Sequence, residues 1–157
     1  MLDCIKRHMP PSQRVKVYAD IEGETLGGCT VPPNVLPTQQ IPDICYVDYE
    51  KKEMVIIELT VPFETNISDA NHRKQDRYAG LVHDITTTGW DCALYCVEIG
   101  SRGLITPQNK QCLHDIMKAC HVKFRYPDLR DRIVFGSYGI FYSRSEPVWQ
   151  HINYLHI

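Results

Sequence analysis

Alternating apolar and polar side chains predict four strands along this chain. Residues 14–20 (RVKVYAD) alternate with the period of two that is typical of a half-buried strand. Residues 43–49 and 54–61 are two runs of strand-forming residues, and the charged turn EKKE between them predicts a β-hairpin. A later run, 92–99, has the same character and ends at the sequence GSRG.

Three longer segments have the character of helices. Ser68 is expected to cap a helix that runs to about Thr87. Residues 107–121 place apolar side chains on one stripe, and residues 129–142 are expected to form a third helix. The order of elements is three strands, a helix, a strand and then helices, which predicts an α/β or α+β sandwich.

The segment between the first strand and the hairpin has a different composition. Residues 22–42 are rich in Gly, Pro and Thr, which favours an extended loop. A loop of this length inside a compact domain needs either a function or a surface to lie against. The whole chain of 157 residues fits a single domain. We expect one domain over 1–157, with a core at about 14–105 and C-terminal helices at about 107–145.

Composition narrows the cellular setting. Hydrophobic residues make up 43% and charged residues 23% of the chain, as in an ordinary globular protein. No apolar run approaches the roughly 20 residues that cross a membrane, and the first residues lack the apolar stretch of a secretory signal. Seven cysteines without a Cys-x-x-Cys pair favour reduced, buried thiols. We therefore expect no membrane partner and an intracellular location.

The net charge of -2 weighs only weakly on partners. It argues against a broad nucleic-acid-binding surface, because domains with such a surface are usually basic. It is compatible with a local basic groove, because a site built from carboxylates itself adds negative charge.

The hairpin suggests chemistry because each of its two strands carries an acid at the end away from the turn. Asp43 opens the first strand and Glu58 lies late in the second, and in an antiparallel hairpin these positions are neighbours. Side chains alternate between faces, so Glu58 shares a face with Ile56 and Thr60, and Asp43 shares one with Cys45. Whether both acids lie on the same face depends on the register, which the sequence leaves open.

Two neighbouring acids of this kind would suit a divalent cation. A carboxylate inside an apolar strand is costly unless it is paired or binds metal. Asp43, Glu58 and the backbone carbonyl of Leu59 together supply the hard oxygens that Mg²⁺ prefers. Such an ion polarises a phosphodiester and lowers the pKa of an attacking water. The alternatives are a turn-capping role for Asp43 and an ordinary ion pair for Glu58.

The helix after the hairpin supplies cations. At 100° per residue, Lys74 lies on the same arc of the helix as Asn71, Tyr78 and Ile85. The C-terminal half of this arc is apolar, so the arc should face the sheet. Lys74 is therefore expected to point inward, toward the acids, where its ammonium would orient water or stabilise developing charge. The alternative is a lysine that extends from a buried face to solvent. Arg73 and Arg77 flank this arc and are expected to hold DNA phosphates.

These residues together resemble a known family. They are similar to the restriction-like endonuclease of non-LTR retrotransposons, within the PD-(D/E)XK superfamily, over about residues 14–105. The matching strings are Ile41-Pro42-Asp43-Ile44, Glu58-Leu59-Thr60-Val61-Pro62, Glu64, Lys74-x-x-Arg77-Tyr78 and Val97-Glu98-Ile99-Gly100-Ser101-Arg102-Gly103.

The resemblance implies a restriction-endonuclease-like α/β fold, a central mixed sheet flanked by helices, and cleavage of DNA with Mg²⁺ or Mn²⁺. It implies metal binding by Asp43 and Glu58. Thr60 stands where the motif has its lysine, and Lys74 is the natural substitute, since some branches supply the lysine from the following helix. Lys74-x-x-x-Tyr78 also resembles the Gln-x-x-x-Tyr motif of recombination nucleases. The residues expected to contact DNA are Arg73, Arg77, Tyr78 and Arg102, although core packing with a bonded hydroxyl is favoured for Tyr78.

The sequence leaves two functions open. The first is a metal-dependent DNA endonuclease in the nucleus. It would be either the nicking domain of a retrotransposon protein, beside a reverse transcriptase or DNA-binding domain, or a homodimeric nuclease for branched DNA. The second is a catalytically inactive nuclease-fold module that binds nucleic acid or protein, which Thr60 favours. The presence of Asp43, Glu58 and Lys74 together favours the enzyme.

Overall fold

The computed structural model describes residue 1, residues 14–23 and residues 25–144, and it describes side chains only as far as residue 142. The segments at both ends of the predicted domain 1–157 therefore lie partly outside the described residues. The elements, in chain order, are β1 (Val15–Ala19), β2 (Ile44–Asp48), β3 (Glu53–Thr60), a short 3-10 helix η1 (Glu64–Asn66), α2 (Ile67–Thr87), β4 (Asp91–Glu98), α3 (Pro107–Ala119) and α4 (Tyr126–Arg144).

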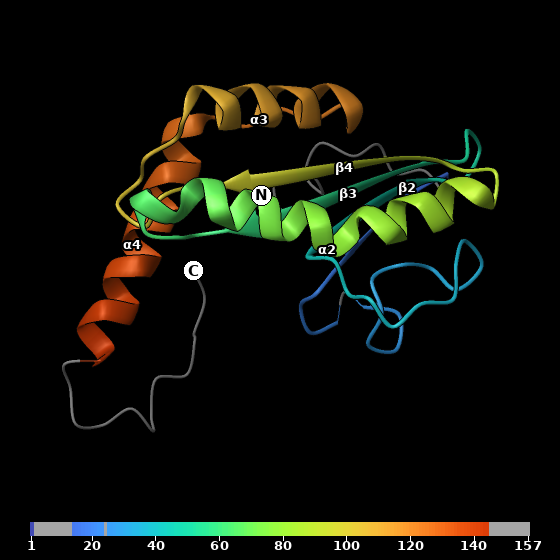
Figure 1. Cartoon of the computed structure of the whole chain (residues 1–157), viewed down its shortest axis with the longest axis horizontal. Helices are drawn as coiled ribbons and strands as arrows, with labels where there is room; N and C mark the ends of the chain where they lie inside the picture. Colours follow the sequence, from blue (N-terminus) through green and yellow to red (C-terminus); the bar gives the residue numbers. More distant parts are fainter. Residues whose placement is uncertain (2–13, 24, 145–157) are drawn as a thin grey trace.

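The four strands form one mixed sheet in the order β1-β2-β3-β4. The pairs β1–β2 and β2–β3 are antiparallel, whereas β3 and β4 are parallel. A parallel pair needs a long crossover, and α2 provides it. Figure 1 shows α2 and α3 on opposite sides of the sheet, with α4 descending from one end. The predicted mixed sheet flanked by helices is confirmed.

Strand alternation divides the apolar side chains between two cores. The face under α3 and α4 is packed with side chains such as Ile44, Ile57 and Val97. The opposite face, under α2, has a core that consists of Tyr18, Val31, Val35, Cys45, Val47, Met54, Ile56, Tyr78, Leu81 and Ile85. The second face is the one that the candidate acids share.

The long loop over 22–42 lies against the sheet on the α2 side (Figure 1). Val31 and Val35 are buried in the α2-side core, and the Thr30 hydroxyl donates to the Pro42 carbonyl at 2.9 Å. The loop and α2 therefore cover this face of the sheet together. The sheet is the surface that a loop of this length was expected to lie against.

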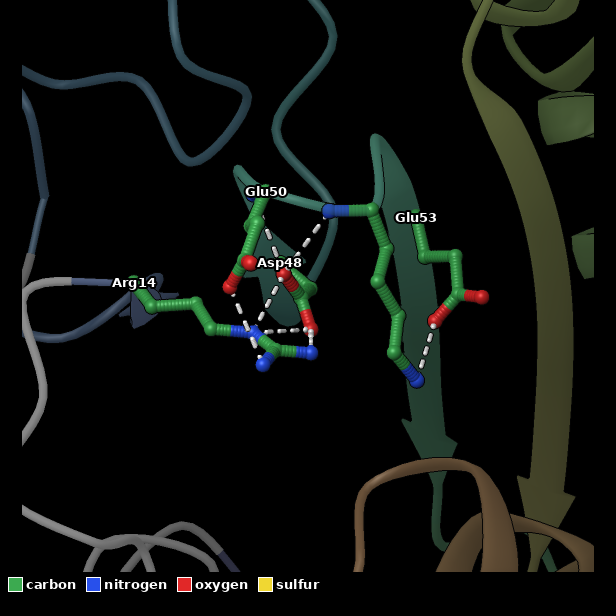
Figure 2. Close-up of polar contacts among 5 residues, drawn as sticks. Arg14, Asp48, Glu50 and Glu53 are labelled. Carbon is green, nitrogen blue, oxygen red and sulfur yellow. Dashed lines mark hydrogen bonds and ion pairs between the residues drawn. The ribbon is translucent and has the colours of Figure 1, made fainter.

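The turn of the hairpin is held by an ion pair between Asp48, at the end of β2, and Arg14, which precedes the neighbouring strand β1. Arg14 donates to both oxygens of Asp48 at 2.9–3.1 Å, and its other amino group lies 3.0 Å from Glu50 (Figure 2). Asp48 also accepts the backbone N–H groups of Glu50 and Lys51. These bonds hold the pKa of Asp48 below its ordinary value, the Arg14 hydrogen bond being the largest cause.

Two details of the predicted helices are wrong. Asn66, not Ser68, is the N-cap residue of α2, because the chain is already turned by η1 before Ser68. The last helix begins at Tyr126, three residues earlier than expected. None of the helices in the described ranges is long and apolar enough to cross a membrane.

Candidate functional site

Asp43 and Glu58 meet where β2 begins and β3 ends. The hairpin pairs Cys45 with Ile56 and Ile44 with Ile57, so the next pair along the ladder is Asp43 with Glu58. The two residues are locked reciprocally: the Asp43 N–H donates to Glu58 Oε1 at 2.9 Å, and the Leu59 N–H donates to Asp43 Oδ2 at 2.7 Å. The register left open by the sequence therefore places both acids on the α2 side of the sheet.

The two carboxylates differ in their contact with solvent. The side chain of Glu58 is 0% exposed, whereas that of Asp43 is 35% exposed. Asp43 therefore forms the mouth of the site, and Glu58 its floor. An incoming ligand would meet Asp43 first.

Lys74 closes the space between the two acids. Its ammonium donates to Glu58 Oε2 and lies 4.0 Å from Asp43 Oδ2. The Lys74 side chain is 22% exposed. The predicted inward direction of this lysine is confirmed, because α2 places it on the arc that faces the sheet. The buried charge of Glu58 is thereby neutralised, as a carboxylate in an apolar strand requires.

Tyr78, one turn further along α2, is 1% exposed. Its hydroxyl donates to the Ile41 carbonyl at 3.2 Å and so ties α2 to the end of the long loop. Burial raises the pKa of this phenol, with a smaller effect from the negative charge of Glu58. Core packing is confirmed for Tyr78. The expected contact of its side chain with DNA stays a prediction, for which this burial leaves little surface.

Glu98 is a second buried acid beside this site, and the prediction did not include it among the site residues. It is 1% exposed, and it ends β4 opposite Thr60 of β3. Asn71 donates to Glu98 Oε2 at 2.9 Å, and the Asn109 side chain accepts the Glu98 N–H. The signal that singled out Glu58, an acid inside an apolar strand, is equally present in the sequence CALYCVE.

Among the described residues, two buried oxygens beside the site have no hydrogen-bond partner: Glu98 Oε1 and Thr60 Oγ1. Burial raises the pKa of Glu98, whereas the Asn71 hydrogen bond and the charge of Lys74 lower it to a smaller extent. Because Thr60 and Glu98 are register partners on parallel strands, their side chains lie on the same face of the sheet. A polar extension of the site therefore lies between Glu58 and the end of β4.

The three predicted DNA-binding arginines have different surroundings. Arg73 and Arg77 are exposed on α2, one on each side of Lys74 in sequence, and the Arg77 guanidinium lies 5.3 Å from the Tyr78 ring. Arg102 lies in the loop after β4, where Glu64 accepts both its side-chain and its backbone N–H. Arg73 and Arg77 thus have the exposure that a phosphate contact needs, whereas Arg102 is engaged with Glu64.

The donor set at this site consists of two carboxylates, which fit a magnesium-type ion. Among the residues that the structure describes, no three His, Cys, Asp or Glu side chains gather as a metal cluster. The site instead offers Asp43 and Glu58, and Mg²⁺ is commonly held by one or two carboxylates together with waters. Leu59 enters the site through its N–H, so a role for its carbonyl stays a prediction.

Comparison with known proteins finds a distant likeness among solved structures. No family model and no curated protein matches the sequence. Among solved structures, the chain is similar to an N-terminal domain of a reptarenavirus L protein, with a TM-score of 0.44 and 14% identity. The match covers 76% of this chain and 67% of that chain. What the chain does must therefore be argued from the geometry of its own site.

Proposed function

We propose that this chain is a divalent-cation-dependent DNA endonuclease of the restriction-like type, with Asp43 and Glu58 as its metal-binding acids. The observation that carries the proposal is the meeting of these two carboxylates with the Lys74 ammonium on one face of the sheet. Asp43 precedes β2, Glu58 lies near the end of β3 and Lys74 lies in the first half of α2. The buried core beneath holds them in place.

Each residue has a role that its surroundings permit. Asp43 and Glu58 would hold Mg²⁺ or Mn²⁺, which supplies polarisation of the scissile phosphate and a lower pKa for a bound water. Lys74 would stabilise the charge that develops on the phosphate, a contribution that is strong where water is largely excluded. Arg73 and Arg77 would hold the neighbouring phosphates of the DNA strand.

Two observations favour the second candidate function, an inactive module that binds nucleic acid or protein. Lys74 already neutralises Glu58, and Thr60 stands where the motif of the resembled family has lysine. In that case Asp43, Glu58 and Lys74 would form ion pairs that serve only the stability of the fold. The two functions differ in whether the acids are needed for cleavage or only for folding.

The proposal is tested by nicking of supercoiled and branched DNA in Mg²⁺ and in Mn²⁺. The variants are Asp43→Asn and Glu58→Gln, which keep the shape of each side chain and remove its charge. We expect each to reduce nicking by at least about 10²-fold, because a cation site loses one of its two protein ligands. Chelation of the cation should abolish nicking by the wild-type protein.

Glu53→Gln is the matched control, because Glu53 is an exposed glutamate at the opposite end of the same strand β3. It should nick DNA like the wild-type protein. Nicking that survives both Asp43→Asn and Glu58→Gln would contradict the site assignment. DNA binding without cleavage in either cation would favour the inactive module.

A further inference from the structure

The Lys74 ammonium and a divalent cation compete for the same oxygen. Lys74 donates to Glu58 Oε2 and lies 4.0 Å from Asp43 Oδ2, so its charge occupies the space between the two acids. A cation held by these acids would repel an ammonium at that distance. Binding of the cation therefore requires Lys74 to move away from Glu58, and the ammonium then needs another acceptor, because little of this side chain is exposed to water.

Glu98 offers that acceptor. Its Oε1 atom has no hydrogen-bond partner in the part of the chain that the structure describes, although the residue is 1% exposed. A buried carboxylate oxygen without a donor is unfavourable, so an ammonium placed there would satisfy it. Thr60 lies opposite Glu98 on the neighbouring strand, and its buried hydroxyl also lacks a partner among the residues described. Both groups could bind the same ammonium.

The position of Glu98 suits a movement of the Lys74 side chain alone. Asn71 and Lys74 are neighbours on the surface of α2, and they contact Glu98 and Glu58 respectively. The two glutamates thus lie opposite adjacent positions of one helix. Lys74 has a flexible four-carbon stem, and its charge already acts on Glu98 through space. Rotation of that stem toward Asn71 would carry the ammonium from one carboxylate to the other.

We propose that Glu98 is a positioning residue that accepts the Lys74 ammonium when a divalent cation binds Asp43 and Glu58. Glu98 then acts on the cation through Lys74, without contacting the cation itself. The inference rests on the proposed function, because it assumes that these acids bind a cation. It adds a role for Glu98 and Thr60 that the pair of acids alone does not require.

The test is a calorimetric titration of Mn²⁺ into four forms of the full chain: wild type, Glu98→Gln, Lys74→Met, and the double variant. Glu98→Gln should weaken Mn²⁺ binding about tenfold in the wild-type background, as loss of an outer partner of a metal site typically does. In the Lys74→Met background the same change should have little effect, since no ammonium needs an acceptor. An equal loss in both backgrounds would overturn the inference, because Glu98 would then act without Lys74.

A spectroscopic readout in the wild-type protein covers the case in which Glu98→Gln fails to fold. The ¹⁵N resonance of the Lys74 ammonium should shift on addition of Mg²⁺ and show a through-space contact to the Glu98 side chain. An ammonium that stays with Glu58 in saturating Mg²⁺ would overturn the inference.

Glu64→Gln is the control, because Glu64 is another glutamate near the ends of β3 and β4 but pairs with Arg102. It should leave Mn²⁺ affinity unchanged. Mn²⁺ binding that depends on Asp43 and Glu58 but not on Glu98 overturns this inference alone. Absence of Mn²⁺ binding by the wild-type protein overturns both the inference and the proposed function.

Discussion

Glu58 is a carboxylate inside an apolar strand, and its contacts explain how the fold tolerates it. Its two oxygens accept the Asp43 N–H and the Lys74 ammonium. Removal of one member of such a buried pair is strongly destabilising, because the remaining charge has no compensation. The same arrangement therefore serves stability and positions the groups of the candidate site.

Lys74→Met is expected to lower the free energy of unfolding at pH 7 by about 3 kcal/mol, the lower end for breaking a buried pair, since Lys74 keeps some exposure. Urea denaturation measures this change. The double variant Glu58→Gln/Lys74→Met should recover most of the loss, because neither partner is then charged. A double variant that is less stable than Lys74→Met alone would contradict this account of the pair.

The sequence predicts Asp43, Glu58 and Lys74 as a group because two simple periods determine where their side chains point. Alternation along β3 places Glu58 with Ile56, and the helical period places Lys74 with Tyr78. Glu98 follows from the same alternation, since it is two residues beyond Cys96. Its contacts depend on the parallel pairing of β3 with β4, which the sequence pattern does not reveal.

At the scale of elements, the hairpin β2–β3 carries the site. The structure pairs Cys45 with Ile56, and the sequence alone does not determine this register, because both strands are apolar on both faces and a shift of one residue would exchange one apolar set for another. The far end of the hairpin is held by Arg14 and Asp48 (Figure 2). The cap of α2 was less predictable, because η1 changes the path of the chain before Ser68.

Asp48→Asn is expected to lower the free energy of unfolding at pH 7, because it removes the charge that Arg14 and two backbone N–H groups stabilise. The folded pKa of Asp48 is lower than its ordinary value of 3.8, so its stabilisation is full above that pH and is lost as the pH falls through the folded pKa. The difference between wild type and variant should therefore shrink at strongly acidic pH. Urea denaturation across the acid range measures it.

Glu50→Gln provides the comparison, because Glu50 pairs with the same arginine but is exposed. It should change stability only slightly, as exposed ion pairs generally do. A difference between wild type and Asp48→Asn that persists unchanged below the folded pKa would show that the loss of stability does not come from the charge of Asp48.

At the scale of the whole molecule, the arrangement of layers places the site at one end of the two central strands, on the face that α2 covers. The start of β2 and the end of β3 adjoin there, while α2 lies across the face and the long loop packs beside it (Figure 1). The order of elements predicts these layers. The packing of the loop over 22–42 depends on contacts between distant residues, such as Val31 with the α2-side core, and its composition alone gives no sign of them.

The central claim is that Asp43 and Glu58 bind one divalent cation, and titration of Mn²⁺ followed by electron paramagnetic resonance tests it most directly. Wild-type protein should bind Mn²⁺ with a stoichiometry near one, and Glu58→Gln should weaken this binding by at least about tenfold, since one of two protein ligands is lost. Equal Mn²⁺ affinity in wild type and Glu58→Gln, with both proteins folded, would contradict the claim.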